Sequence, residues 1–346
     1  PWFRESPPLA PRHQAIQLSR QLQFRGCRWQ LAVRRSWRDS GDEQGAAQAL
    51  LKQQETKPLM GHSYQDANWT SADGLTLYFR DYGGPEGYDG PPVLCMHGLT
   101  RNSRDFAELA EHLAKTRRVI VPEMRGRGQS DYAPDSSTYN PKQYVADVEL
   151  LLKQEGIESF ISVGTSMGGL MTMMLAAAQP GRLSAVVMND IGPQIDAAGL
   201  TRIGGYVGQG RSYPTWLHAA RSMSSVHSQA FPGYDLEAWI EMAKRTMVVS
   251  QNGRISYDYD MAIAEPFKEP GNAAPADLWP AFDALKDVPM VLVRGELSDL
   301  LSPETVAEMG KRNPAMTNVT VPGVGHAPML SEPEAAEAID ALLAKV

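Results

Sequence analysis

The residues Gly164-Thr165-Ser166-Met167-Gly168-Gly169 decide the fold, because they set a serine among closely spaced glycines. They follow a predicted strand, 160–163, and open a predicted helix, 167–178. A serine on so sharp a turn is held in strained backbone geometry, and a Cβ on its neighbours would collide with the adjoining strand and helix. Its hydroxyl is exposed at the carboxyl edge of a sheet, where the first amides of the helix face developing negative charge. The pattern predicts that Ser166 is a nucleophile.

Short β-rich runs alternate with longer helical patterns on both sides of this turn. The alternation predicts βα units and a mostly parallel sheet, and therefore an α/β fold. Several runs are continuously apolar, as strands covered on both faces should be. The predicted strands are 75–80, 92–96, 118–121, 160–163, 185–188, 290–293 and 317–320. The predicted helices are 103–115, 141–155, 167–178, 303–312 and 333–345.

The alternation stops between residues 194 and 286, a segment that we call the insert. It carries helical patterns at 214–224 and 236–249 and many aromatic residues, but no convincing parallel strand. An insertion of that size between two strands is more typical of a second layer over the sheet than of a loop. We interpret it as a helical cap, or lid, on a core formed by residues 60–193 and 287–346.

A serine hydroxyl is a weak nucleophile, and it needs an imidazole to take its proton and a carboxylate to orient that imidazole. His326 is the one histidine beyond the insert, and it lies on a glycine-flanked loop between the last predicted strand and helix. Three carboxylates follow predicted strands. Asp299 and Glu296 follow the predicted strand 290–293, whereas Asp190 follows the predicted strand 185–188. We favour Asp299, which gives the chain order Ser, Asp, His.

The attack of a serine on a carbonyl also requires hydrogen-bond donors for the oxyanion. The amide of Met167, directly after the nucleophile, is one candidate. The second is the amide of Leu99 in Met96-His97-Gly98-Leu99-Thr100, where Gly98 lets the backbone approach closely. We expect His97 to orient this loop rather than to act as a base.

Together these motifs resemble the α/β-hydrolase superfamily over residues 68–346. The sharp turn at residues 164–169, which we call the elbow, lies at a family-like position. So do the His97-Gly98 loop, the Ser298-Asp299 loop and Gly325-His326. The resemblance implies an eight-stranded, mostly parallel sheet with helices on both faces and a helical cap inserted after the sixth strand. Glu123 is a departure, since similar relatives more often carry aspartate there, and we expect it to have a structural role.

The resemblance leaves several chemistries open. Ser166 excludes the dehalogenases and epoxide hydrolases of this fold, which use aspartate at the elbow. Hydrolases that cleave carbon–carbon bonds in ring-fission products tend to have a glycine-rich oxyanion loop, whereas this loop reads Leu99-Thr100-Arg101-Asn102-Ser103. We therefore favour a carboxylic ester hydrolase, a serine carboxylesterase. Carbon–carbon cleavage, lactone hydrolysis and a perhydrolase activity are the alternatives, and a small-ligand receptor on the same fold is the non-enzyme alternative.

Aromatic residues and methionines of the insert are candidates for an apolar substrate pocket. We predict substrate contacts from Trp216, Trp239, Tyr257 and Met261. The sequence shows no His or carboxylate spacing typical of a catalytic metal and no glycine-rich phosphate loop. It therefore predicts an enzyme without a metal or a cofactor.

The composition is typical of a globular protein rather than of a membrane protein. Hydrophobic residues make up 42% and charged residues 21% of the 346, as in an ordinary globular protein. The sequence has no run of about 18 apolar residues that could span a bilayer. Its two cysteines, Cys27 and Cys95, cannot supply a disulfide framework, which favours a reducing, cytoplasmic compartment. A homo-oligomer is compatible with these features.

The net charge of -7 is divided unevenly. Residues 1–59 hold ten Arg or Lys and five Asp or Glu, a charge of +5, so the remaining 287 residues carry -12. We interpret residues 1–59 as a basic N-terminal extension, with a targeting segment, a partner-binding arm, and non-native or disordered sequence ahead of Met60 as the alternatives. The acidic body argues against nucleic acid as a partner and favours a small uncharged or apolar ester as the substrate.

Overall fold

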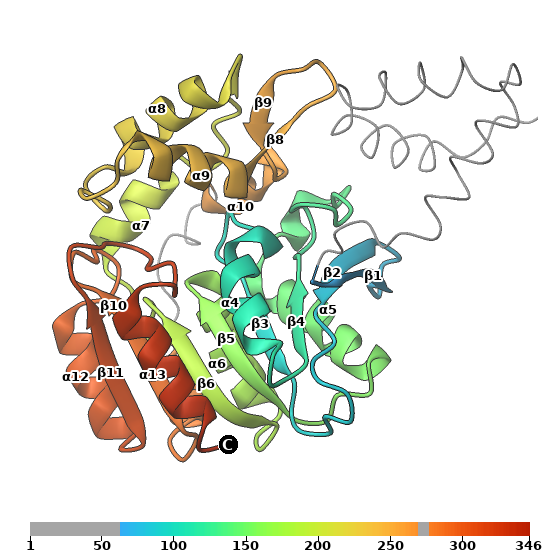
Figure 1. Ribbon diagram of the computed structural model, residues 1–346, viewed down its shortest axis with the longest axis vertical. Helices are drawn as coiled ribbons and strands as arrows, with labels where there is room; N and C mark the ends of the chain where they lie inside the picture. The colour runs from blue at the N-terminus through green and yellow to red at the C-terminus, as the bar shows by residue number, and fades with distance from the viewer. Residues whose placement is uncertain (1–62, 269–276) are drawn as a thin grey trace, which may run out of the picture. The chain divides into compact units, whose positions relative to one another are not determined.

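The computed structural model of the protein describes residues 63–268 and 277–346 (Figure 1). The predicted N-terminal extension, 1–59, lies outside the described residues. Within them, eight strands form one sheet in the order β1-β2-β4-β3-β5-β6-β10-β11. The strands are β1 (Gln65–Thr70), β2 (Thr76–Asp81), β3 (Val93–Met96), β4 (Val119–Pro122), β5 (Phe160–Thr165), β6 (Leu183–Asn189), β10 (Met290–Gly295) and β11 (Met316–Val321).

The predicted eight-stranded, mostly parallel sheet is confirmed. The pairs from β4 to β11 are parallel, and only β1 with β2 and β2 with β4 are antiparallel. The sequence analysis did not predict β1. It is a polar edge strand in which Trp69 alone is fully buried, so it lacks the apolar run that marks the central strands.

Helices cover both faces of the sheet, because the central strands bury side chains on both sides. In β3, Leu94 and Met96 belong to one core cluster, and Val93 and Cys95 belong to a second on the opposite face. Figure 1 shows α4 and α13 in front of the sheet, where they contribute to the second cluster. The helices of the core are α4 (Ala107–Leu113), which follows the 3-10 turn η1 (Ser103–Phe106), α5 (Pro141–Gln154), α6 (Met167–Ala178), α12 (Pro303–Arg312) and α13 (Pro333–Leu343).

The insert lies at the side of the sheet where β5 and β6 end (Figure 1). It has a small core of its own, which includes Met223, Phe231, Trp239 and Met242. Its elements are α7 (Ala197–Gly204), β7 (Ser212–Tyr213), α8 (Trp216–His227), α9 (Leu236–Thr246), β8 (Met247–Val249), β9 (Ile255–Tyr257), the 3-10 turn η3 (Met261–Ala264), α10 (Glu265–Lys268) and α11 (Trp279–Asp283).

The insert is not purely helical. The predicted helix 236–249 ends at Thr246, and the next three residues form β8 in a three-stranded antiparallel sheet of order β7-β9-β8. Two valines at the end of β8 favour the extended backbone. Gly253, at φ +77°, closes the tight turn to β9 through the bond from its amide to the Ser250 carbonyl. A local hairpin therefore replaces the last turn of the predicted helix.

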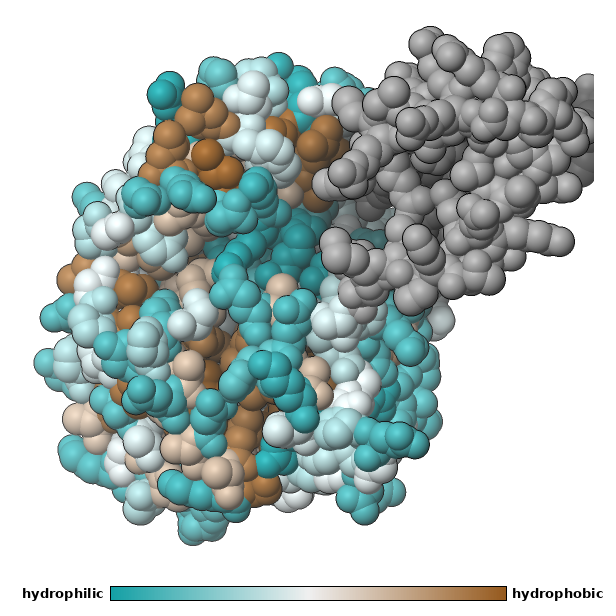
Figure 2. Space-filling model, viewed as in Figure 1, coloured by the Kyte–Doolittle hydropathy of each residue, from teal (hydrophilic) through white to brown (hydrophobic). Residues whose placement is uncertain are grey.

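The surface of the insert carries several large apolar side chains. Val226, Leu236 and Val249 are three of the five most exposed large hydrophobic residues in the described ranges. Figure 2 shows hydrophobic residues on the insert, at the top of this face, among hydrophilic ones. No helix within the described ranges is long and apolar enough to cross a membrane.

Glu123, the residue directly after β4, has the structural surroundings that we expected for it. Its buried carboxylate accepts hydrogen bonds from the amide and the hydroxyl of Ser103, at 3.1 and 2.7 Å, and from the amide of Gln129, at 2.6 Å. Gly128 lies against it at φ +56°, and a Cβ there would lie 1.9 Å from the Glu123 Oε2 atom. Burial raises the pKa of Glu123. The glutamate thus ties the turn after β4 to the start of η1, next to the oxyanion loop.

Candidate active site

The elbow has the strand–turn–helix geometry that the sequence predicts. Ser166 stands between β5 and α6 with φ 52° and ψ -113°, a left-handed backbone that is strained for a residue with a side chain. A Cβ on Gly164 would lie 2.6 Å from the backbone of Gly168, and a Cβ on Gly168 would lie 2.0 Å from the carbonyl oxygen of Met96. The two glycines therefore let α6 start directly against β5 and β3.

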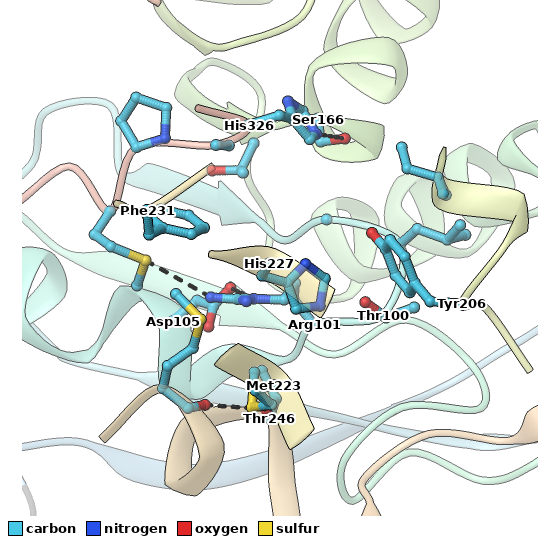
Figure 3. Close-up of a pocket in the computed structure, with 18 of the residues that line it drawn as sticks. Thr100, Arg101, Asp105, Ser166, Tyr206, Met223, His227, Phe231, Thr246 and His326 are labelled. Atoms are coloured by element: carbon cyan, nitrogen blue, oxygen red, sulfur yellow. Dashed lines mark hydrogen bonds and ion pairs between the residues drawn. The ribbon is translucent and has the colours of Figure 1, made fainter. Parts of the chain in front are cut away.

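Three side chains form a hydrogen-bonded row at this elbow. His326 Nε2 lies 2.8 Å from Ser166 Oγ, the contact drawn in Figure 3, and His326 Nδ1 lies 2.7 Å from Asp190 Oδ2. The Asp190 carboxylate is fully buried and also accepts hydrogen bonds from the Gly295 amide at 2.9 Å and the Ser298 hydroxyl at 2.7 Å. A carboxylate held in this way keeps the proton on Nδ1 and leaves Nε2 free to accept from the serine.

The structure corrects the choice of carboxylate. Within the described residues His326 Nδ1 is paired with Asp190, and no hydrogen bond joins Asp299 to His326. Asp299 forms a two-point ion pair with Arg202 of α7, at 2.5 and 2.8 Å, which holds the pKa of Asp299 below its usual value. Glu296 is exposed and accepts a hydrogen bond from the amide of Gly323 at 2.7 Å. The prediction of Asp299 as the partner of His326 is therefore wrong.

The position of Asp190 follows from the order of the strands. It is the first residue after β6, and β6 pairs with β5, the strand that carries Ser166. Its own backbone is left-handed, at φ 53°, and its amide donates to the carbonyl of Val293 in β10. A carboxylate at the end of the strand next to the elbow strand is the signal that could have favoured Asp190.

The two predicted oxyanion donors are the backbone amides of Leu99 and Met167, for which no acceptor is found among the described residues. The loop that carries Leu99 is held by the buried side chain of His97, whose Nδ1 lies 2.8 Å from the Gly98 carbonyl and whose Nε2 accepts the Met124 amide at 3.0 Å. His97 thus has the orienting contacts that the sequence analysis expected.

His97 should stay neutral far below the ordinary titration range of histidine. Burial lowers the pKa of His97 to about 4. Because the folded pKa lies below the usual value of about 6.5, its contribution to stability is complete above about pH 6.5 and is lost as the pH falls from there through about 4. We expect an NMR titration, assigned by comparison with the His97→Asn variant, to give a midpoint near 4. A midpoint in the ordinary range would contradict the burial of this imidazole.

A pocket lies over Ser166 and His326, with walls from both the core and the insert (Figure 3). The insert contributes mainly apolar and aromatic side chains: Ile203, Tyr206, Met223, Phe231, Met242, Tyr257 and Tyr259. The core contributes the oxyanion loop, Arg101, Asp105 and residues 327–330. The sequence analysis did not predict the two charged residues, because they lie in a polar stretch that resembles an ordinary helix start.

One of the four predicted substrate contacts lines this pocket, namely Tyr257. Trp239 instead packs inside the insert, with ring centroids 6.1 Å from Phe231 and 5.2 Å from Tyr234. Trp216 packs against the same small core, and Met261 packs against the larger cluster that includes Leu94 and Met96. The apolar periodicity of α9 predicted that Trp239 is buried but could not show which neighbours bury it.

A family model matches most of the chain and identifies its family. It is the model of the α/β hydrolase fold, and it matches residues 91–333. The chain belongs to the α/β-hydrolase family. This α/β-hydrolase therefore belongs among hydrolytic enzymes, and the elbow and sheet described above are its family features.

Individual relatives give a closer comparison. This α/β-hydrolase is similar to the 3-hydroxybutyrate-oligomer hydrolase of Cupriavidus necator, with 36% identity over 265 residues that cover 74% of this chain and 89% of the relative. It is 27% identical to the 2-(acetamidomethylene)succinate hydrolase of Mesorhizobium japonicum over 73% of this chain and 85% of that protein. A crystal structure of an α/β hydrolase from Novosphingobium aromaticivorans matches with 54% identity and a TM-score of 0.79, covering 82% of this chain and 99% of that one.

Within the ranges that the structure describes, no group of three or more His, Cys, Asp or Glu side chains could hold a metal ion.

Proposed function

We propose that this α/β-hydrolase cleaves carboxylic esters through an acyl-enzyme on Ser166. The observation that carries the proposal is the row Asp190–His326–Ser166, with bonds of 2.7 and 2.8 Å, beside two backbone amides that have no acceptor in the described part of the chain. A base within hydrogen-bond reach of the nucleophile, itself oriented by a third group, is the arrangement that nucleophilic catalysis requires.

The reaction follows from the roles of these groups. His326 Nε2 takes the proton of Ser166 as the hydroxyl attacks the ester carbonyl, and Asp190 stabilises the imidazolium. The amides of Leu99 and Met167 hold the oxyanion, each contributing ~3 to 4 kcal/mol of transition-state stabilisation. His326 then gives the proton to the departing alcohol. Water, activated by the same imidazole, hydrolyses the acyl-enzyme and restores the free serine.

The pocket and the relatives support an ester as the substrate. The name of the Cupriavidus necator relative assigns it 3-hydroxybutyrate oligomers, in which one hydroxy acid is esterified to the next. The insert lines the pocket with apolar side chains, which suit the hydrocarbon part of such a substrate. We propose that the insert acts as a cap that covers this part of the substrate.

A fluorophosphonate probe tests the nucleophile. The probe should label the protein, and labelling should be lost in Ser166→Ala, because an activated serine is the group that it modifies. Ser137→Ala is a matched control, since Ser137 is an exposed serine away from the pocket, and this variant should be labelled like the unchanged protein. Equal labelling of the Ser166→Ala variant would contradict the assignment.

A substrate panel tests the reaction. p-Nitrophenyl acetate and butyrate should be hydrolysed, and the same preparation should be assayed with lactones and with ring-fission products. Turnover of the ring-fission products in preference to all esters would favour carbon–carbon cleavage on the same serine. Tight binding of a small ligand without turnover of any compound would favour a receptor.

A further inference from the structure

One cationic side chain faces the pocket. Among the described residues that line it, Arg101 is the sole arginine or lysine, and Asp105 is the sole carboxylate. The Arg101 side chain is 22% exposed, so it is reachable from the pocket rather than sealed in the core. The proposed ester hydrolysis gives this guanidinium no role.

The hydrogen bonds of Arg101 leave part of the guanidinium available. Its Nε donates to Asp105 Oδ2, and its Nη2 lies 3.7 Å from the sulfur of Met329, which is a weak acceptor. Within the described ranges Nη1 has no partner. A guanidinium presents five N–H groups in a fixed planar fork, and the bonds to Asp105 and Met329 leave the Nη1 side of that fork unused. Asp105 therefore holds Arg101 in place without occupying the edge that could bind an anion.

The stem of Arg101 passes close to the nucleophile. A Cβ on Gly98 would lie 3.4 Å from Arg101 Cγ and 3.7 Å from Ser166 Cβ, so both side chains border the same small space. Figure 3 shows the guanidinium beside His227 and Asp105, across the pocket from Ser166 and His326. A substrate with its ester carbonyl at Ser166 can therefore extend toward the cation.

His227 does not add a second charge next to Arg101. Burial, followed by the positive charges of Arg101 and Arg202, lowers the pKa of His227 to about 4. The imidazole is thus neutral near pH 7, and the ring of Tyr206 packs on it with a centroid distance of 4.9 Å. The far end of the pocket consequently presents the Arg101 guanidinium, held by Asp105, beside an uncharged imidazole.

We propose that Arg101 binds a free carboxylate at one end of the ester substrate. The preferred substrates are then short oligoesters of hydroxy acids, which end in one carboxylate, and this inference rests on the proposed ester hydrolysis. Water cleaves the ester bond to give one new carboxyl group and one new hydroxyl, and the carboxylate at Arg101 takes no part in that step. The charge of -12 outside residues 1–59 favours uncharged substrates at long range, but solvent screens it beyond about 8 Å, whereas Arg101 acts by direct hydrogen bonds.

The test compares the dimer of 3-hydroxybutyrate with its methyl ester, which lacks the charge but has the same scissile bond. We expect the unchanged protein to prefer the acid by about ten-fold or more in kcat/KM, and Arg101→Gln to lose that preference, mainly through KM. Because Arg101→Gln leaves Asp105 unpaired and able to repel the acid, the double variant Arg101→Gln/Asp105→Asn is measured beside it. Labelling of Ser166 by a fluorophosphonate checks that each variant is folded.

Arg202→Gln is the matched control. It removes one positive charge from α7, where Arg202 pairs with Asp299 outside the pocket lining, and it should keep the preference for the acid. Equal turnover of acid and methyl ester by the unchanged protein, or a preference that persists in the double variant, would overturn the role of Arg101. Failure of the unchanged protein to hydrolyse any ester or to react with the probe would instead overturn the proposed function, and this inference with it.

Discussion

Asp190→Asn is expected to lower kcat for ester hydrolysis by about 10⁴-fold. The amide of an asparagine at this position can donate to the His326 ring, which would move the ring proton to Nε2 and point it at Ser166. A serine that faces an N–H has no base to accept its proton. The side chain keeps its shape and can still accept from the Gly295 amide, so the loss should fall on catalysis rather than on folding.

Asp299→Asn is the matched comparison, because it makes the same chemical change on the loop after β10. It weakens an ion pair with Arg202 that is partly exposed to solvent, and such pairs contribute little. We expect kcat within about five-fold of the unchanged protein. Both variants should be measured with p-nitrophenyl butyrate after their folding is verified by circular dichroism. The opposite ranking of the two variants would show that Asp299, not Asp190, orients His326.

Gly168→Ala is expected to lower the free energy of unfolding by about 3 kcal/mol or more. The added Cβ would lie 2.0 Å from the carbonyl oxygen and 2.6 Å from the carbonyl carbon of Met96 in β3. These are backbone atoms of a strand that is buried on both faces, so the clash cannot be relieved by a side-chain rotation. The start of α6 would have to move away from β3, and the amide of Met167 would move with it.

Gly204→Ala is the control for this prediction, because both glycines are in helices and only their surroundings differ. Nothing lies within 4 Å of a Cβ built on Gly204, at the exposed end of α7. Alanine there should leave stability unchanged or raise it by up to about 1 kcal/mol. Denaturant unfolding measures both variants, and a Gly168→Ala protein as stable as Gly204→Ala would show that α6 and β3 are packed less tightly than described.

The elbow could be predicted from sequence because its requirements are local. Gly164 and Gly168 are needed where a strand turns directly into a helix, and both stand next to Ser166 in the chain. His326 was predictable for a similar reason, since a loop between the last strand and the last helix ends at the same edge of the sheet. The amide of Met167 belongs to the elbow and that of Leu99 to the His97-Gly98 loop, so both predictions also rested on local sequence.

The acid was harder to select from local sequence, because Asp190 and Asp299 both follow strands that end at that edge. β6 lies between β5 and β10, so the loops after β6 and β10 are both near His326. The two carboxylates differ in their partners, because Arg202 of the insert forms an ion pair with Asp299. That pairing leaves no periodic signal. The apolar periodicity of α9 shows that Trp239 is buried but not whether it faces the pocket or the core of the insert, which is why Trp239 was assigned to the pocket.

The pair Arg202–Asp299 has a further consequence for how members of this family diverge. It joins the first helix of the insert to the loop after β10, and the neighbouring Ser298 on that loop donates to Asp190. The segment that shapes the substrate pocket is thus connected, through two adjacent residues, to the buried acid. An exchange of inserts between relatives, in evolution or in the laboratory, replaces the partner of position 299 together with the pocket wall. The small effect expected for Asp299→Asn means that the buried acid should tolerate this replacement, so that the insert can change substrate range without disturbing Asp190.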